Sequence, residues 1–429
     1  MQQYPDSWWA ASARQHCAFP ALAEDTEVDV AIVGGGFTGL SAAHHLQRAG
    51  LQCAVLEANR IGWGASGRNG GIAVPRYKWT YPELERKYGF DVAALMYRSA
   101  HDALDTLESI VRSRGLDCGF ARTGHLTPVV SASDVPRFSQ DVQWLASRLA
   151  DTWPRVADEV EAAQKTGTSF YTAAYLEPRG AVIHPLEYCI TLAKGLHADG
   201  VKIHCDTPVL SWACSGDAVV IQTSNARVRA RQLLLATNAY SDLTPAGKAL
   251  AKRVVPVASA VIATEPLPEA LRSTILPDGE AATDAKRLTN YYRVLRDGSF
   301  FFGGRGGASS RASQRIYDRL RRDMLAIYPQ LESVRVRHQW FGLVAVTLDT
   351  VPHIGSLQAR VHYGMGYNGR GVALAALFGR KLAQMALGDM PQLGPMSEGS
   401  FQPIPFHAFR VPAKQVVISW KQLVDSLGV

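Results

Sequence analysis

Residues 28–57 contain a strand, a glycine-rich turn, a helix and a second strand, in an order that few folds accommodate. The turn has the pattern G-x-G-x-x-G, formed by Gly34, Gly36 and Gly39, and the second strand ends at Glu57. The first glycine permits a tight turn, the second lets backbone approach a pyrophosphate, and the third lets the helix pack on the strand. The complete unit predicts a bound dinucleotide whose ribose hydroxyls donate to Glu57, whereas tight β–α packing alone would explain only the glycines.

A second glycine cluster, GMGYNG at 364–369, precedes a long apolar helix predicted over 372–387. No second strand leads to an acid after this helix, and Asp389 falls in a loop, so the ribose-binding half is missing. The positive N-terminus of such a helix attracts negative charge, as on the N1 and C2 oxygen of a reduced flavin. The two glycine clusters together therefore favour FAD over NAD.

The chain of 429 residues exceeds what one hydrophobic core normally serves, so two joined domains are expected. Its N-terminus lacks the order of a signal peptide, and no apolar run approaches the ~18 residues of a membrane span, which predicts a cytoplasmic protein without an integral membrane segment. The net charge of +7 is spread along the chain, which argues against a nucleic-acid partner. The six cysteines have no metal-type spacing, so no metal site is expected.

The order of strand and helix patterns predicts an α/β fold: a Rossmann-like FAD-binding domain with an inserted α+β substrate domain that carries a mixed antiparallel sheet. Strands are expected at 201–205, 218–223, 226–230 and 232–236, and mostly helix between 81 and 168. The predicted segments are 1–80, 170–253 and 335–390 for the FAD-binding domain, 81–169 and 254–334 for the substrate domain, and 391–429 for a C-terminal tail.

Several stretches of the sequence resemble one family of flavoenzymes. They include SWWAASA at 7–13, VAIVGGGFTGLSAAHHL, LEANRIGWGASGRNGG, LLLATNAY, ATEPL, YYR, FFGGR, WFGLVAVTLDTVPHIG and GYNGRGVALAALFGR. In this order they resemble the FAD-dependent amine oxidoreductases, such as D-amino acid oxidase, glycine oxidase and sarcosine oxidase, with the γ-glutamylputrescine oxidoreductase group as the nearest. The resemblance covers nearly the whole chain.

This resemblance implies that the loop IGWGASGRNGG at 61–71 wraps the flavin side of FAD, with Ser66, Arg68 and Asn69 directed at the cofactor. A plain glycine-rich surface loop is the competing interpretation. The FAD is expected to be held non-covalently, because FGLVAVTLD has no cysteine and the loop has no histidine. The predicted cofactor-binding residues are Gly34, Gly36, Phe37, Thr38, Gly39, Glu57, Ala58, Ser66, Arg68, Asn69, Gly70, Gly71, Val209, Ala236, Thr237, Asn238, Gly342, Tyr367, Asn368, Gly369, Gly371 and Val372.

Flavin-dependent amine oxidation needs a neutral amine held in a dry cage, so that hydride leaves its α carbon for flavin N5 and the resulting imine hydrolyses to aldehyde or keto product. Alternation along 289–294 puts Tyr291 and Tyr292 on opposite faces, so at most one faces the substrate. Arg305 and Arg370 are flanked by glycines and suit a carboxylate clamp, although solvated arginines are the alternative. The predicted catalytic residues are Tyr291, Tyr292, Arg305, Trp340, His353 and Arg370, with core aromatics and a structural histidine as the competing interpretations.

The sequence also departs from the sarcosine oxidase type. The strand at 299–302 has no lysine where that type places one above the flavin. The resemblance also implies that Ala373 or a neighbour replaces the carboxylate-binding lysine of that type. The expected substrate is therefore a small-molecule amine other than simple N-methylglycine, an ω-amine or γ-glutamyl amine, with oxygen or another electron acceptor. A flavin-dependent 2-hydroxy acid dehydrogenase and a non-catalytic flavin-binding subunit remain as alternatives.

Overall fold

The computed structural model describes residues 3–307, 313–397 and 401–405, and it organises them around two eight-stranded sheets. The apolar run that was expected as the first strand forms β1 (Thr26–Val33) at the centre of the first sheet. β1 pairs in parallel with two neighbours, β2 (Cys53–Leu56) and β11 (Arg227–Leu235), and is buried along most of its length. This environment matches the continuous apolar pattern, because a parallel strand is covered on both faces.

The first sheet has the order β17-β18-β11-β1-β2-β8, and a meander of β9 and β10 pairs with β11. β11 is a single strand where the sequence suggested two short ones. The remaining strands are β8 (Lys202–His204), β9 (Val209–Ser215), β10 (Ala218–Thr223), β17 (His353–Gln358) and β18 (Val361–Met365).

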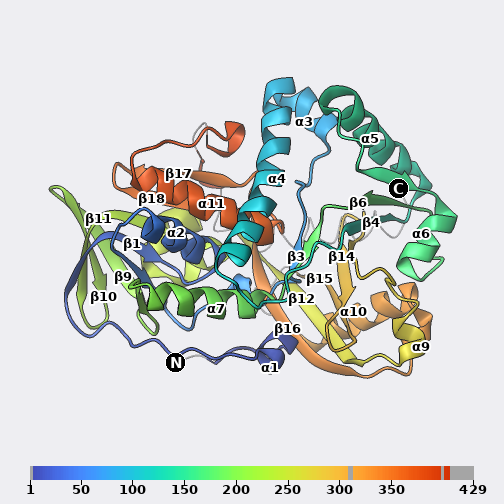
Figure 1. The fold of residues 1–429 in the computed structure, drawn as a ribbon, viewed down its shortest axis with the longest axis horizontal. Helices are drawn as coiled ribbons and strands as arrows, with labels where there is room; N and C mark the ends of the chain where they lie inside the picture. Colours follow the sequence, from blue (N-terminus) through green and yellow to red (C-terminus); the bar gives the residue numbers. More distant parts are fainter. Residues whose placement is uncertain (1–2, 308–312, 398–400, 406–429) are drawn as a thin grey trace.

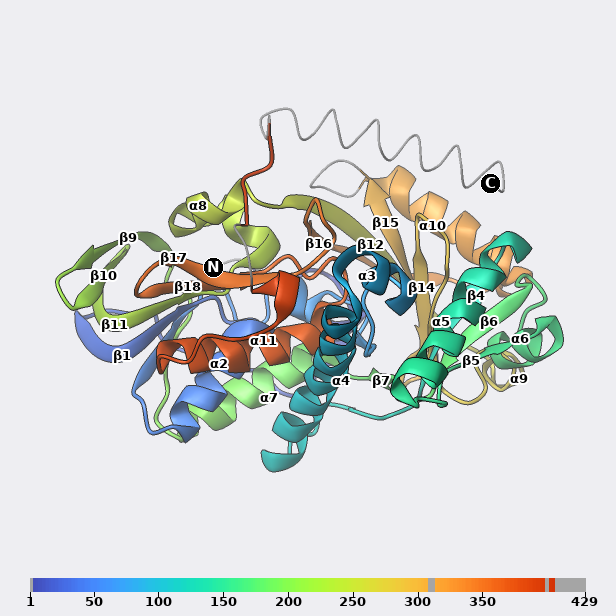
Figure 2. The same cartoon turned by 90° about the horizontal axis from the view of Figure 1, so that it is seen from above.

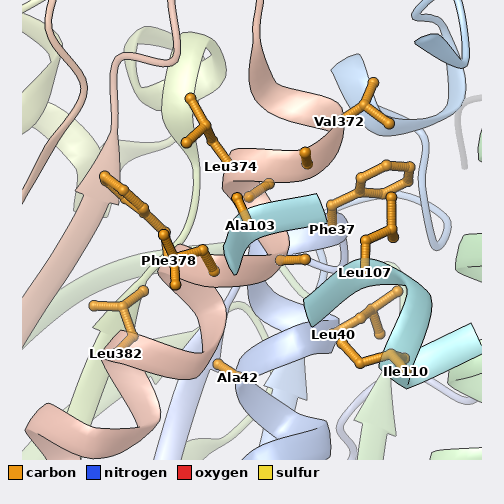
Figure 3. Packing of buried hydrophobic residues seen from close by; sticks show 14 of the residues in the cluster. Phe37, Leu40, Ala42, Ala103, Leu107, Ile110, Val372, Leu374, Phe378 and Leu382 are labelled. Atoms are coloured by element: carbon orange, nitrogen blue, oxygen red, sulfur yellow. The ribbon is translucent and has the colours of Figure 1, made fainter. Parts of the chain in front are cut away.

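One face of this sheet is covered by α2 (Phe37–Arg48), α7 (Pro185–Ala198) and α11 (Gly371–Ala386), against which α4 (Phe90–Ser113) packs. Figure 3 shows side chains of α2, α4 and α11 meeting in this core, among them Leu40, Leu107 and Phe378. Gly379 of α11 lies so close to α2 that an added Cβ would meet Ser41 at 2.4 Å. This close packing places the N-termini of α2 and α11 at one end of the sheet.

The second sheet is mixed, with the order β16-β12-β15-β14-β13-β4-β6-β5. Its β13–β4 pair is parallel and its other pairs are antiparallel, as expected for the substrate domain. The strands are β4 (His125–Val129), β5 (Arg155–Ala157), β6 (Ala173–Glu177), β12 (Val255–Pro266), β13 (Ala281–Thr283), β14 (Asn290–Val294), β15 (Ser299–Gly307) and β16 (Val336–Val346). The predicted fold class is confirmed.

Figures 1 and 2 show the two sheets in two lobes, with α4 between them. The other helices are α1 (Trp8–Ser12), α3 (Tyr81–Tyr88), α5 (Val135–Leu149), α6 (Glu159–Thr166), α8 (Lys248–Ala251), α9 (Glu269–Arg272) and α10 (Gln314–Ile327). A small sheet pairs β3 (Ile72–Ala73) with β7 (Ala181–Val182). Among the described residues no helix has the length and apolar character needed to cross a bilayer.

The sheets divide the chain at positions other than the predicted segment limits. β6 and β16 pair within the second sheet, although 170–253 and 335–390 were expected to belong to the FAD-binding domain. Their apolar patterns suit either sheet, because periodicity does not encode the pairing partner. Of the predicted tail at 391–429, residues 398–400 and 406–429 lie outside the described part of the chain.

Candidate functional site

A cavity of about 1460 Å³ is lined by residues of both sheets and of the loops between them. Pockets for drug-sized ligands occupy roughly 300–1,000 Å³. The volume therefore exceeds the need of one small substrate and suits a dinucleotide together with a substrate.

The glycines of the first turn form one end of the cavity. Gly34 has φ +113°, a conformation that side-chain-bearing residues rarely adopt. A Cβ at Gly39 would come within 2.0 Å of the Gly34 carbonyl oxygen, so Gly39 serves helix packing and does not line the cavity. Gly36 caps α2 and lines the cavity, so the positive end of the helix faces it.

Glu57 lies where a ribose would bind. Its two carboxylate oxygens accept the backbone N–H groups of Gly35 at 2.7 Å and Asn59 at 2.9 Å. Burial raises the pKa of Glu57 above its ordinary value, although these N–H groups favour the charged form. The carboxylate is therefore fixed in place at the cavity wall before any ligand binds.

The loop at 61–71 also lines the cavity, but its polar side chains form hydrogen bonds mainly with backbone groups of the protein. The Ser66 hydroxyl accepts the N–H of Phe37 at the start of α2, and the Arg68 guanidinium donates to the Trp63 carbonyl at 2.7 Å while lying over its ring. The Asn69 amide is folded back onto its own loop, where its oxygen accepts the N–H of Gly71. The backbone of the loop is therefore more available to a bound ligand than these side chains are.

The second glycine cluster contributes Tyr367, Asn368 and Gly369 to the cavity lining and contacts α2. The hydroxyls of Tyr367 and Thr38 are 2.7 Å apart, which joins the N-terminal ends of α11 and α2. The Asn238 side chain accepts the N–H of Gly366, and Asn368 bonds to Thr347. One side-chain bond thus joins the two helix N-termini, and two others hold the second cluster to neighbouring segments.

Most of the predicted cofactor residues line this one cavity. They are Gly34, Gly36, Phe37, Thr38, Glu57, Ala58, Ser66, Arg68, Asn69, Gly70, Ala236, Thr237, Asn238, Gly342, Tyr367, Asn368, Gly369, Gly371 and Val372. Besides Gly39, two residues lie away from it. Val209, the first residue of β9, is buried in the core, and a Cβ at Gly71 would come within 2.1 Å of the Ile183 carbonyl oxygen.

The second sheet contributes Tyr291 to the cavity. Its hydroxyl is 2.9 Å from that of Ser259, and burial raises its pKa to about 12, so it stays protonated at neutral pH. Tyr292 points to the opposite face, where its hydroxyl donates to Tyr171 within the core. The predicted alternation along β14 is therefore confirmed, and of the two tyrosines Tyr291 is the one that lines the cavity.

Trp340 and His353, two other predicted catalytic residues, are not among the described residues that line the cavity. The Trp340 indole donates to the Arg68 carbonyl from behind the loop, at 2.9 Å. His353 is 3.0 Å from Asp349 and stacks on Phe401, the structural arrangement that was the alternative for a histidine. Arg305 belongs to β15, but its side chain lies outside the described atoms.

Arg370 lines the cavity just before α11. Within the part of the chain that the structure describes, its guanidinium has no ion-pair partner and no hydrogen-bond acceptor. Burial is the main cause that lowers its pKa to about 10, and the nearby charge of Arg76 adds to this. Arg370 is partly buried, and withdrawing an unpaired cation from water is costly, so this position favours an anionic ligand group.

Further cations that the sequence did not single out line the same cavity. Arg76 is buried, forms an ion pair with Asp141 at 2.7 Å and stacks on the Tyr175 ring. No local pattern could have indicated it, because its partners come from α5 and β6. The other lining cations are Lys78, Arg137, Lys286 and Arg287, and the lining acids are Glu57 and Asp284.

The sequence also matches known proteins. The model of the FAD dependent oxidoreductase family matches residues 29–385. The chain is 31% identical to gamma-glutamylputrescine oxidoreductase of Escherichia coli over 100% of both chains, and 30% identical to a probable oxidoreductase OrdL of Haemophilus influenzae over 91% of this chain and 90% of that protein. The chain belongs to the family of FAD-dependent oxidoreductases. The family expected from the sequence is confirmed.

Solved structures of other flavoenzymes share the fold. Glycine oxidase from Geobacillus kaustophilus superposes with a TM-score of 0.73 at 18% identity, covering 86% of this chain and 98% of that one. L-proline dehydrogenase from P. horikoshii superposes with a TM-score of 0.72 at 19% identity, covering 87% and 96%. The cavity of this FAD-dependent oxidoreductase fits its cofactor in size, in its glycine-rich wall and in its two helix N-termini.

Proposed function

We propose that this protein oxidises an amine whose far end carries a carboxylate, such as a γ-glutamylated ω-amine. The observation that carries the proposal is the unpaired Arg370, which lines the same cavity as the glycine-rich turn at 34–39 and the N-terminus of α11. We call this turn and the two helix N-termini the cofactor cradle. The names of two relatives support an amine or amino acid as substrate: the E. coli gamma-glutamylputrescine oxidoreductase, and a glycine oxidase of Bacillus licheniformis that is 25% identical over 84% of this chain.

The charged and the less polar cavity residues contact different ends of the proposed substrate. Arg370 binds the carboxylate, and the Tyr291 ring with its neutral hydroxyl forms a wall for the reacting end. The partly apolar wall lowers the pKa of a bound amine, which favours the neutral, oxidisable form. When bound, FAD would supply the acceptor for the hydride of the α carbon. Water would then hydrolyse the imine of a primary ω-amine to an aldehyde and ammonia.

An anaerobic screen tests the substrate class. We expect γ-glutamyl amines to bleach the visible flavin absorbance quickly, because they combine an amine with a distal carboxylate. Polyamines, N-methyl amino acids and D-amino acids serve as comparison amines, and 2-hydroxy acids test the alternative chemistry. Reduction by 2-hydroxy acids alone would overturn the amine assignment, and no reduction by any compound would favour a non-catalytic flavin subunit.

We also propose that FAD is bound without a covalent link. The described cavity lining contains neither cysteine nor histidine, the residue types expected for a linkage, and FGLVAVTLD is free of cysteine. Acid precipitation of the purified protein should therefore release all the yellow colour into the supernatant. Colour that stays in the washed pellet would contradict this prediction.

A further inference from the structure

The loop that faces the cavity is bound from behind by three buried side chains. The Trp340 indole donates to the Arg68 carbonyl at 2.9 Å, and the Trp9 indole donates to the Asn69 carbonyl at 2.8 Å. The Arg293 guanidinium donates to the Gly71 carbonyl at 2.9 Å. None of the three donors lines the cavity, so they hold the backbone from the side away from it.

Trp9 comes from the SWWAASA motif, which the site described so far leaves unexplained. The motif forms α1, whose N-terminus is capped by the Ser7 hydroxyl accepting the Ala10 N–H. The Trp9 ring is 1% exposed and packs edge-on against Trp8 and His184. Trp8 makes an equivalent bond, but to Asp297 at 2.8 Å, which lies outside the loop.

The direction of these carbonyls determines the direction of the next amides. In a trans peptide the C=O of one residue and the N–H of the following residue point in opposite directions. Because the carbonyls of Arg68 and Asn69 are held away from the cavity, the N–H groups of Asn69 and Gly70 point toward it. Both residues line the cavity, and neither N–H has an acceptor among the described residues.

A buried amide without an acceptor is uncommon in a folded protein, and Gly70 is buried. The isoalloxazine ring offers ring nitrogens and carbonyl oxygens as acceptors, and the cofactor cradle ends at this loop. We propose that the Asn69 and Gly70 amides form a donor pair for the acceptor edge of the flavin, and that Trp9 and Trp340 are positioning residues that hold this pair in place. The proposal rests on FAD use and not on the amine substrate.

Comparing two tryptophans of one helix tests the proposal. Trp9→Phe removes the indole N–H that holds the Asn69 carbonyl, while Trp8→Phe removes an equivalent bond that does not touch the loop. We expect Trp9→Phe to raise the Kd of the apoprotein for FAD about 5- to 10-fold. Its Kd for ADP, which lacks the flavin, should stay unchanged, and Trp8→Phe should leave both constants unchanged.

A second readout reports on the flavin itself. Weaker donation to the ring destabilises the reduced, more negative flavin, so the reduction potential of the Trp9→Phe holoprotein should become more negative. Trp340→Phe should change the FAD constant and the potential in the same directions, because it frees the neighbouring carbonyl. The proposal is overturned if Trp9→Phe weakens ADP and FAD equally, which indicates general damage to the fold, or if Trp8→Phe and Trp9→Phe have equal effects on FAD.

Discussion

Gly36→Asp should leave the protein unable to retain FAD. Gly36 caps α2 at the cavity wall, and a Cβ at this position would come within 2.7 Å of the Ser66 hydroxyl. The new carboxylate would also face the pyrophosphate, and two unit charges about 4 Å apart repel by about 4 kcal/mol near a protein surface. We therefore expect the Kd for FAD to rise about 1,000-fold from charge alone, measured by titrating apoprotein with FAD.

Gly36→Asn is the matched control, because asparagine has the shape of aspartate without its charge. It should weaken FAD binding less than Gly36→Asp does, and the ratio of the two constants gives the electrostatic contribution. If the two variants bind FAD equally, steric displacement of Ser66 explains the whole loss and the helix N-terminus does not face the pyrophosphate.

The cofactor cradle could be predicted from sequence because each of its requirements is local. The turn needs positive φ at Gly34 and no side chain at Gly39, and both requirements are visible as glycines within six residues of sequence. The strands on either side are indicated by their own apolar pattern. The alternation that separates Tyr291 from Tyr292 is local in the same sense. These features appear in the structure as they were expected.

Features that depend on distant partners could not be predicted. Nothing near Trp340 in the sequence shows that its indole bonds to the Arg68 carbonyl, and Trp340 is among the predicted catalytic residues. Val209 follows a Thr-Pro turn that predicts contact of its backbone with adenine, and its side chain packs in the core. The sheet to which β6 and β16 belong could not be predicted either, because apolar periodicity does not indicate which strand is the neighbour.

Arg370→Gln should selectively weaken the binding of carboxylated amines. The guanidinium has no partner among the described residues, so a substrate carboxylate would be its counter-ion in the cavity. Removing it should cost about 1.5–3 kcal/mol in binding, a loss of roughly 10- to 150-fold in affinity. The measurement compares γ-glutamylputrescine with putrescine, which lacks the carboxylate, by anaerobic titration of each variant.

Arg137→Gln is the matched control, since it also removes one cation from the cavity lining. Arg137 is already paired with Glu83 at 2.9 Å and is partly exposed, so its loss should change affinity by less than about 1 kcal/mol. Arg305→Gln tests the other candidate clamp. If Arg370→Gln weakens both amines equally, Arg370 does not bind the carboxylate, and if only Arg305→Gln is selective, the clamp lies on β15.

Stability supplies an independent check on the same residue. Burial lowers the pKa of Arg370 to about 10, which means that the empty protein disfavours the charged guanidinium. A neutral glutamine should therefore leave the free energy of unfolding of the substrate-free protein unchanged or higher, while substrate affinity falls. A variant that loses both stability and affinity would instead show that Arg370 holds the fold together, because a residue kept for its ligand costs stability when the ligand is absent.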